Sequence, residues 1–434
     1  MKIDIVGGGV AGLAAAWFLE RRGFETEVHE ASDRLGGKIA TGDIEGRPVE
    51  LGPDAFLARV HDAVELCRAL GLGDQLIAPA TGSAHLLLGG RLRPLPEGLV
   101  LGVPSDVVAV ARSGVISNLG LLRAAAEPFL PGRPLRHDAS VGAVVRNRFG
   151  AEVFEKLVDP LVSGINAGRA DELSIDATTP QLSTLARRDR SLLVAARRAR
   201  KTAPAGGPVF LTVRSGLQRL VDALAADLQG AINLRAQVHS LNDLDGDGVV
   251  IAAPAFAAAD LLDGDAAREL AAIPYASVAL TVLTYPLAAV RRHLDGSGFL
   301  VPRAEDRLMT ACSWGSSKWP HWSAPDRVVL RISAGRSDDE RALALDDAEL
   351  GARLHAEVAT VLNITGDPDQ VAVTRWPRSF PQYAVGHLDR VNRIEAALPP
   401  NVALAGAALR GVGIPACIAS GRAAADRLAS TLGP

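Results

Sequence analysis

The pattern of apolar and polar positions at the start of the chain predicts a strand, a helix and a second strand in immediate succession. An apolar run from Ile3 to Val6 leads into a glycine-rich turn, and residues 11–22 then read as a largely buried helix. The next strand is expected at residues 25–30, where it ends on an acid, Glu30. This order is the βαβ arrangement of a nucleotide-binding sheet.

The turn between the first strand and the helix has the spacing of a dinucleotide fingerprint, Gly7-Gly8-Gly9-Val10-Ala11-Gly12. Gly7 allows a tight turn, Gly9 lets the backbone approach a diphosphate, and Gly12 lets the helix pack closely on the strand. The N-terminus of the helix points its amides at the phosphates, while Glu30 can accept hydrogen bonds from a ribose diol. An ordinary βαβ unit with a glycine turn is the alternative, which the full order of elements disfavours.

The residues after Glu30 indicate a flavin rather than a nicotinamide cofactor. Gly36 and Gly37 let a second backbone loop lie against the diphosphate, with Arg34 near its charge. A nicotinamide cofactor that must leave is seldom enclosed from both sides, whereas a resident FAD usually is. A simple turn is the alternative interpretation of this glycine pair.

Further along, the pattern predicts a helix at 61–72, a hairpin with a Gly-Gly turn at 83–92 and a mostly helical stretch from 105 to 200. Residues 202–208 read as a linker. The elements expected after it are a strand at 209–213, a helix at 216–228, strands at 232–241 and 248–254, antiparallel strands within 277–301 and at 327–333, a helix at 346–362, a strand at 402–406, a glycine-rich turn at 411–418 and a helix at 419–432.

Composition limits the class of protein. The chain of 434 residues is long enough for two or three domains, and 48% hydrophobic against 22% charged residues indicates a well-buried globular protein. The net charge of −3 gives no support for nucleic-acid binding. The cysteines, Cys67, Cys312 and Cys417, are too widely spaced for a disulfide framework or a metal site, and we expect small buried hydrophobes in a reducing cytoplasm.

No apolar run reaches the length of a membrane span, and the N-terminus enters the first strand without room for a signal peptide. We therefore expect a cytoplasmic protein with at most peripheral membrane contact. Residues 99–130 carry many apolar positions and could line a groove or touch a membrane surface, although internal core is the favoured interpretation.

Several further stretches carry a resemblance to a known family: 50–56 (ELGPDAF), 159–168 (DPLVSGINAG), 310–314 (TACSW), 318–321 (KWPH), 375–376 (RW), 381–383 (PQY), 386–387 (GH) and 411–418 (GVGIPACI). With them the chain resembles, over nearly its whole length, the FAD-dependent protoporphyrinogen and coproporphyrinogen oxidases of the amine-oxidase and carotenoid-desaturase group. It is most similar to the Gram-positive type, whose members act on coproporphyrinogen III.

The resemblance implies an α/β fold with a Rossmann-like FAD-binding domain, a mixed-sheet substrate domain and a helical insert. We expect residues 1–57, 209–260 and 376–434 in the discontinuous FAD-binding domain and residues 261–375 in the substrate-binding sheet domain. Residues 58–208 would form the insert, a candidate region for membrane association or substrate entry.

The fingerprint and the resemblance together imply a non-covalent FAD. A plain core valine is the alternative role for Val238, which is expected within a strand, and Trp376 could likewise be a core aromatic. The expected cofactor contacts are Gly7, Gly8, Gly9, Val10, Ala11, Gly12, Glu30, Ala31, Arg34, Gly36, Gly37, Lys38, Gly52, Pro53, Asp54, Ala55, Val238, Trp376, Gly406, Val412, Gly413 and Ile414.

No residue is assigned as catalytic, because the resemblance implies that the flavin performs the chemistry. Asn166 departs from relatives that often have an aromatic residue there, and Leu409-Arg410 replaces an aromatic and an acid. Both departures are expected to border the active site and therefore bear on substrate preference. The active-site candidates are Gly164, Asn166, Gly168, Lys318, Tyr383, His387 and Arg410.

The chemistry needs few side chains. A porphyrinogen has weak meso C–H bonds, and its oxidation requires positioning and exclusion of water more than a strong base. We hypothesise three two-electron oxidations of coproporphyrinogen III to coproporphyrin III in haem biosynthesis, with O2 reoxidising the flavin to give H2O2. The alternatives are protoporphyrinogen IX as substrate, another amine-oxidase-type FAD oxidase, or a non-catalytic protein of the same superfamily, such as the GDP-dissociation inhibitors.

The four propionates of the substrate call for cations. Candidates are Lys318, His387, Arg410 and the basic run of residues 187–190 and 197–201. A solvated helix face is the favoured interpretation of the basic run. It could also be the surface where an acidic partner such as a ferrochelatase docks.

Overall fold

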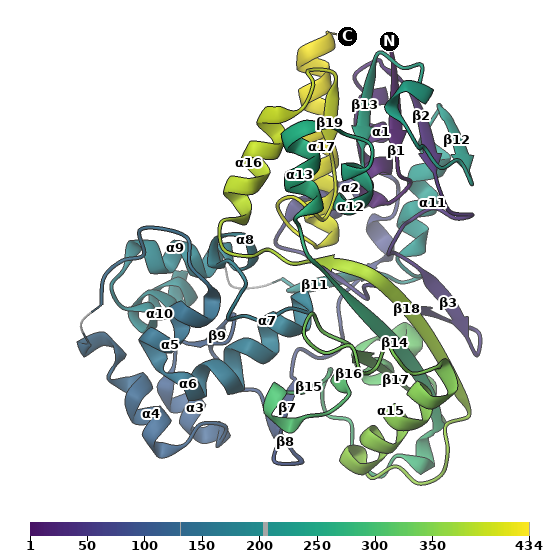
Figure 1. The fold of residues 1–434 in the computed structure, drawn as a ribbon. Helices are drawn as coiled ribbons and strands as arrows, with labels where there is room; N and C mark the ends of the chain where they lie inside the picture. Colours follow the sequence, from purple (N-terminus) through teal and green to yellow (C-terminus); the bar gives the residue numbers. More distant parts are fainter. Residues whose placement is uncertain (131, 203–206, 434) are drawn as a thin grey trace. The chain divides into compact units, whose positions relative to one another are not determined.

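The computed structural model describes residues 1–130, 132–202 and 207–433, and the chain divides into two compact units (Figure 1). Unit 1 contains Met1–Ala78, Pro208–Pro274 and Leu388–Pro434, and unit 2 contains Pro79–Gly207 and Tyr275–His387. The helical insert and the sheet domain expected from the sequence both fall largely within unit 2. The three-part division itself stays a prediction.

Unit 1 is built on a five-stranded parallel sheet in the order β12-β2-β1-β13-β19. The buried run predicted for the first strand is present, since every residue from Ile3 to Val6 is buried. The strands are β1 (Lys2–Val6), β2 (Glu25–Glu30), β12 (Ala231–Leu234), β13 (Gly248–Ile251) and β19 (Val402–Leu404).

Small strands and helices complete unit 1. A hairpin of β3 (Thr41–Ile44) and β4 (Arg47–Glu50) follows β2, and β11 (Phe210–Val213) pairs with β5 (Phe56–Leu57) and β6 (Leu76–Ile77). The helices are α1 (Val10–Glu20), α2 (His61–Ala69), α11 (Gln218–Asp227), α12 (Ala255–Ala259), α13 (Gly264–Ala271), α16 (His387–Ala397) and α17 (Ile414–Leu432), with short 3-10 turns at Gly73–Gln75 and Leu241–Asp243.

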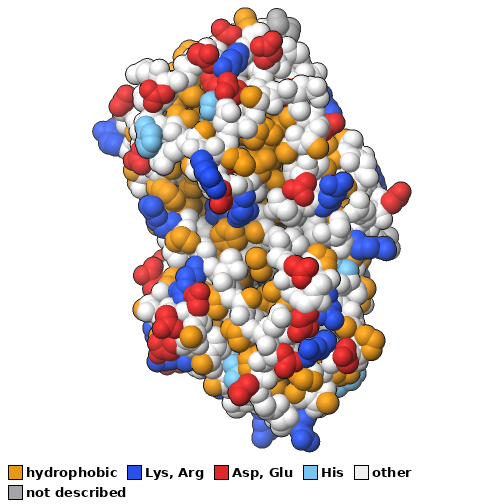
Figure 2. Space-filling view, turned by 90° about the vertical axis from the view of Figure 1, so that its right-hand side faces the viewer, with side chains coloured by type: hydrophobic (Ala, Val, Ile, Leu, Met, Phe, Trp, Pro, Cys, Tyr) orange, Lys and Arg blue, Asp and Glu red, His pale blue; other side chains and the backbone are white. Residues whose placement is uncertain are grey.

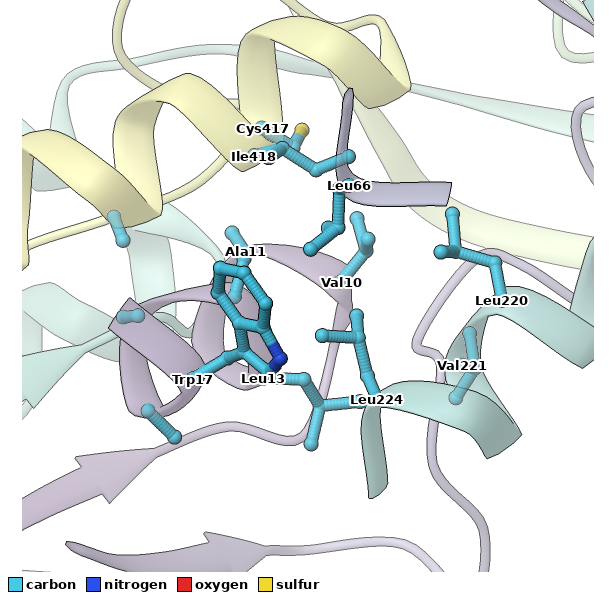
Figure 3. Close-up of a cluster of buried hydrophobic side chains, with 14 of the residues drawn as sticks. Val10, Ala11, Leu13, Trp17, Leu66, Leu220, Val221, Leu224, Cys417 and Ile418 are labelled. Atoms are coloured by element: carbon cyan, nitrogen blue, oxygen red, sulfur yellow. The ribbon is translucent and has the colours of Figure 1, made fainter. Parts of the chain in front are cut away.

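The core of unit 1 lies where α1 packs against α17 and α11, and α2 packs against α17 (Figure 3). The two long helices approach closely because α17 has a glycine at the crossing. A Cβ at Gly421 would collide with the carbonyl oxygen of Ala11 and lie 2.9 Å from the amide of Ala15. This close crossing fixes α17 against the helix that follows the glycine turn.

Unit 2 contains a seven-stranded sheet in the order β18-β14-β17-β16-β15-β7-β8. Helix α15 (Asp347–Leu362) buries Leu350, Leu354 and Val358 in the same cluster as β14, β16 and β17. The predicted Gly-Gly hairpin is confirmed, with Gly89 and Gly90 both at positive φ. The strands are β7 (His85–Leu88), β8 (Arg91–Pro94), β14 (Tyr275–Pro286), β15 (Gly298–Leu300), β16 (Met309–Trp314), β17 (Arg327–Ala334) and β18 (Gln370–Pro381).

The helical part of unit 2 confirms the mostly helical stretch predicted for residues 105–200. Buried Glu127 accepts the amide of Leu192 at 2.9 Å and so ties two distant helical segments together. Its helices are α3 (Val107–Ser113), α4 (Asn118–Ala125), α5 (Val141–Phe149), α6 (Ala151–Val153), a π turn (Phe154–Val158), α7 (Asp159–Asn166), α8 (Ile175–Thr178), α9 (Pro180–Arg188) and α10 (Leu192–Thr202), with a 3-10 turn at Glu127–Phe129 and short strands β9 (Leu99–Val100) and β10 (Val103–Pro104).

Two predicted elements were wrong at one end. The strand expected at 232–241 ends at Leu234, because Arg235 adopts a positive φ of 55° and the chain turns to bond with residues beyond β2. The last helix begins at Ile414 rather than at 419, since Pro415 is tolerated in a first helical turn. The linker predicted at 202–208 lies largely outside the described residues.

Acidic and basic side chains are interspersed on the face of the molecule shown in Figure 2, as the small net charge implies. In the part of the chain that the structure describes, no helix is both long enough and apolar enough to cross a bilayer.

Candidate functional site

The glycine turn between β1 and α1 has the geometry of a phosphate cradle. Gly7 adopts a φ of 113°, and a Cβ at Gly12 would collide with the carbonyl oxygen of Gly7. A Cβ at Gly9, by contrast, would have no atom within 4 Å. Gly7 and Gly12 are therefore required by the fold, whereas Gly9 leaves open space above the N-terminus of α1.

A second glycine loop lies directly against the first. The amide of Gly36 donates to the carbonyl of Gly8 at 2.9 Å, and Gly9 forms a parallel bridge with Gly36. Arg34 holds this loop from within, because its guanidinium donates to the carbonyl oxygens of Ile39, at 3.0 Å, and Gly37. The sequence predicted that Arg34 would lie near the charge of the cofactor. In the structure its guanidinium donates to the backbone of the loop.

Glu30 is held at the end of β2. Its Oε2 accepts the amide of Gly8 at 2.7 Å, and its Oε1 accepts the amide and hydroxyl of Ser32 at 2.8 and 2.6 Å. A carboxylate has lone pairs beyond these three bonds. The acid expected to meet a ribose is thus oriented by the same turn that forms the cradle, and Ala31 lies exposed beside it.

Lys38 brings a half-buried cation to the cradle. A Cβ at Gly52 would collide with the carbonyl oxygen of Lys38, so this glycine permits the close approach of the segment that continues through Pro53, Asp54 and Ala55. Removal from water lowers the pKa of Lys38 below its ordinary value. Within the described residues, no carboxylate forms an ion pair with it.

The C-terminal glycine turn meets the same cluster. The amide of Gly406 donates to Oγ of Ser420 at 2.9 Å, and Gly413 begins α17 without a side-chain cap. Cys417, in the first turns of α17, is close enough to Lys38 for their charges to interact, and burial raises the pKa of its thiol to about 11. Val412 and Ile414 flank the start of the helix.

These features fit an anionic dinucleotide. Gly9 gives α1 no side-chain cap, so the amides of its first turn face the open space. Lys38 supplies a cation that the described protein residues leave uncompensated, and a diphosphate would compensate it. Gly7 to Gly12, Glu30, Gly36, Gly37, Lys38 and Gly52 are brought together within unit 1. Val238 lies in irregular chain beyond β12, not in the strand expected for it.

In unit 2, the candidates on α7 are fixed by internal contacts. Asn166 is buried, and its Nδ2 donates to the carbonyl of Val162 at 2.9 Å. A Cβ at Gly168 would collide with Oε1 of Gln382, while one at Gly164 would meet only the Leu300 side chain at 3.2 Å. Gly168 is thus explained by close contact inside unit 2.

Tyr383 and His387 form a buried stack, with ring centroids 4.1 Å apart and planes 20° from parallel. The carbonyl of Tyr383 accepts the amide of Ser174 at 2.7 Å, which joins this pair to the chain after α7. Trp376 pairs with Val278 and packs against a small cluster that includes Ala167. The structure therefore brings Gly168, Trp376, Tyr383 and His387 into one region of unit 2.

Lys318 is not part of that region. Met309 begins β16 and pairs with Ala334, whereas Lys318 follows the opposite end of this strand. The two ends of β16 lie about 17 Å apart. Its ammonium lies 5.2 Å from the centre of the Trp319 ring. Arg410, in unit 1, is engaged with α16, where its NH2 donates to Glu395 at 2.7 Å and to Asn392 at 2.9 Å.

Part of the basic run is also engaged locally. Arg187 pairs with Asp176 at 2.6 Å and Arg198 with Asp189 at 3.2 Å, while Arg197 donates to the carbonyl of Ser105 at 3.4 Å. These contacts agree with a solvated helix face, the interpretation that the sequence favoured.

The sequence analysis missed the charged network that holds the Gly168 loop. Arg303 donates to the carbonyl of Gly168 at 2.8 Å, to buried Asp159 at 3.2 Å and to Asp338 at 2.6 Å. Asp159 also accepts the amide of Ala170 at 3.2 Å. The signal available in the sequence was an acid, Asp159, followed by a proline at the start of a largely apolar helix.

Comparison with known proteins agrees with this geometry. The chain is 36% identical over 459 residues to the coproporphyrinogen III oxidase of Bacillus subtilis (strain 168), covering 97% of this chain and 96% of the relative. It is 35% identical to the enzyme of that name from Propionibacterium freudenreichii, covering 98% and 90%. A crystal structure from Exiguobacterium sp. 255-15 superimposes with a TM-score of 0.88 at 32% identity, covering 98% of each chain.

More distant likeness shows the fold alone. Cyclohexylamine oxidase from Brevibacterium oxydans superimposes with a TM-score of 0.68 at 18% identity, covering 100% of this chain and 99% of that one.

Residues 10–429 match the model of the flavin containing amine oxidoreductases. This chain, with its paired glycine loops, its oriented Glu30 and its half-buried Lys38, therefore belongs to the flavin-containing amine oxidoreductase family.

Proposed function

We propose that this protein is an FAD-dependent oxidase that converts coproporphyrinogen III to coproporphyrin III in haem biosynthesis. Six hydrogen atoms leave the substrate as three two-electron oxidations, and three O2 are reduced to three H2O2. The observation that carries this most strongly is identity of 30–36% to proteins named coproporphyrinogen III oxidase across nearly the full length of the chain. The glycine cradle in unit 1 supports the proposal that the protein binds the flavin on which the reaction depends.

The bound flavin would supply the hydride-accepting ring, and the residues of the chain would bind and orient. Gly9, the amides that open α1 and Lys38 would hold the diphosphate, and Glu30 would hold the ribose. In unit 2, buried Tyr383 and His387 give the region beside Gly168 a water-poor surface. Such a surface suits a reaction that requires positioning rather than a strong base.

Rapid mixing tests the substrate. Under anaerobic conditions, coproporphyrinogen III should bleach the flavin absorbance, whereas putrescine, an amine that a related oxidase would accept, should leave it unchanged. In air, three H2O2 should form for each coproporphyrin III. An oxidised flavin after anaerobic mixing with the porphyrinogen would refute the assignment, and a purified protein that cannot bind FAD would favour a non-catalytic binding protein instead.

Protoporphyrinogen IX is the second candidate substrate. The chain is 28% identical to a chloroplast protoporphyrinogen oxidase of Arabidopsis thaliana, over 95% of its length. The two substrates differ in two propionates, so cations decide between them. Comparison of kcat/KM for the two porphyrinogens in air separates the candidates, and charge reversal at Arg197, Arg198 and Arg200 with an unchanged KM would exclude these arginines from substrate binding.

We further propose a cytoplasmic protein that touches membranes only peripherally. Exposed apolar side chains gather on α3, α4 and the turn after them, where Leu119 is 77% and Phe129 87% exposed. Co-sedimentation with phosphatidylglycerol vesicles should fall in a Leu119→Glu/Phe129→Glu variant. Equal sedimentation of both proteins would refute this contact. The basic run on α9 and α10 remains the proposed surface for an acidic partner such as a ferrochelatase.

A further inference from the structure

A cavity of about 440 Å³ lies within unit 2, at the end of β14. It lies between the loop that follows this strand and the segment around α14 (Gly315–Lys318), and its lining is rich in cations and hydroxyl groups. The polar side chains that line it are Arg291, Arg292, His293, Ser316, Ser317, Ser323 and Arg327. We call this cavity the Arg291 pocket.

The loop that carries the cations is fixed to the end of α15. The amide of Arg291 donates to the carbonyl of Asn363 at 3.3 Å, and the amide of Arg292 donates to that of Leu362 at 3.2 Å. Val290 forms a bridge with Ile364 in the same place. The backbone on either side of Arg291 is therefore fixed to the end of α15.

Positive charge in the pocket exceeds what the protein compensates. Among the described residues, no carboxylate lines the cavity, and the lining cation Arg327 pairs with Asp369. Among residues 1–130, 132–202 and 207–433, neither Arg291 nor Arg292 forms an ion pair. The Nε of Arg292 is buried without a hydrogen-bond acceptor. A buried donor without an acceptor costs free energy, so the hydrogen bonding of Arg292 is incomplete in the ligand-free protein.

The pocket is remote from the candidate residues around Trp376 in unit 2. Trp376 pairs with Val278 near the start of β14, whereas Arg327 pairs with Pro286 at its end. The stretch from Val278 to Leu287 spans about 30 Å at the rise of about 3.3 Å per residue of a strand. A ligand in the Arg291 pocket would therefore not contact Trp376.

We propose that the Arg291 pocket binds a small polyanion that carries two or more phosphate or carboxylate groups. Two uncompensated guanidiniums with a neighbouring histidine match more than one anionic group, and arginine binds either group through paired N–H donors. The volume suits a small metabolite. This site stands whether or not the protein oxidises a porphyrinogen, because its residues are separate from those of the proposed reaction.

Binding is tested on the full-length, FAD-loaded protein by calorimetry and by tryptophan fluorescence. Two buried tryptophans are close in sequence to residues that line the cavity: Trp319 is two positions after Ser317, and Trp322 directly precedes Ser323. Their emission should therefore report on occupancy. Pyrophosphate and citrate are the probes, and saturable binding of one alone identifies the preferred group. An Arg291→Gln/Arg292→Gln variant should bind at least about tenfold more weakly, as expected for lost charged hydrogen bonds.

The control is Arg112→Gln, which removes an exposed arginine of unit 2 that does not line the cavity. It should bind both probes as the unmodified protein does. If the double variant fails to fold, as judged by near-UV circular dichroism, Ser317→Asp/Ser323→Asp provides the same test, because added negative charge should also abolish binding. Absence of saturable binding to either probe, or equal affinity in protein and variant, would overturn the proposal.

Discussion

The two units position their candidate functional groups in different ways. In unit 1, the cradle is made of backbone: glycine loops that are near one another in sequence meet through hydrogen bonds such as Gly36 to Gly8. In unit 2, the loop at Gly168 is held by side chains from distant parts of the chain, including Arg303 and Gln382. A backbone-built site depends on the absence of side chains, whereas a side-chain-built site depends on charge pairing. The two should therefore fail under different substitutions.

The largest effect is expected when a methyl group is added where the cradle has no room. Gly12→Ala would force a Cβ against the carbonyl oxygen of Gly7, and overpacking against backbone costs about 3 kcal/mol. The melting temperature and the flavin content should both fall. The control is Gly82→Ala, where an added Cβ meets no atom within 4 Å. A fully stable, flavin-loaded Gly12→Ala protein would show that the cradle can widen.

A somewhat smaller loss is expected from the charged network of unit 2. Arg303→Met leaves buried Asp159 without its cation and releases the carbonyl of Gly168, at a cost of about 2 kcal/mol after allowance for the partial exposure of Arg303. Chemical denaturation measures the loss, and kcat/KM should fall while FAD affinity stays unchanged. Reduced FAD affinity in this variant would contradict the separation of the two sites. Arg353→Met, which breaks an exposed pair on α15, is the matched control.

Gly9→Ala separates cofactor binding from folding. The added Cβ meets no protein atom within 4 Å, and Gly9 has an ordinary φ of −71°, so the flavin-free protein should keep its melting temperature. FAD affinity should nevertheless fall about tenfold, because the methyl group occupies the space of the diphosphate and weakens its charged hydrogen bonds. Equilibrium dialysis measures this. Unchanged affinity would mean that the diphosphate lies elsewhere.

The smallest effect concerns pH and Lys38. Its pKa is lowered in the folded, flavin-free protein by burial, so the unfolded chain binds more protons between that lowered value and the ordinary one near 10.5. Stability of the flavin-free protein should therefore rise with pH across this interval, and Lys38→Met should lack the rise. FAD affinity should fall over the same interval as the cation is lost. Parallel pH profiles for protein and variant would contradict a half-buried, uncompensated Lys38.

Much of the fold was predictable because its signals are local. The glycine spacing at 7–12 required the tight turn and close helix approach that Gly7 and Gly12 make, and the Gly89-Gly90 pair required a hairpin. Three buried free cysteines also agree with the expected role as small hydrophobes. Local steric limits leave few conformations for such segments.

Element ends and side-chain partners were less predictable. The strand expected to carry Val238 stops at Leu234 through a non-glycine residue at positive φ, for which the sequence has no signal. Arg410 was a candidate for substrate propionates, yet it meets Glu395 on another helix. Long-range pairs of this kind depend on which elements become neighbours, and residue spacing does not encode that directly.

The sequence by itself determined the nucleotide cradle, because a diphosphate site made of backbone needs glycines at fixed positions and those positions are adjacent in the chain. Only the tertiary structure decided which charges are compensated. It left Lys38 beside the glycine loops and Arg291 and Arg292 at the end of β14 without acidic partners among the described residues. The physical reason is that electrostatic pairing acts through space over a few ångströms, whatever the separation of the two residues along the chain.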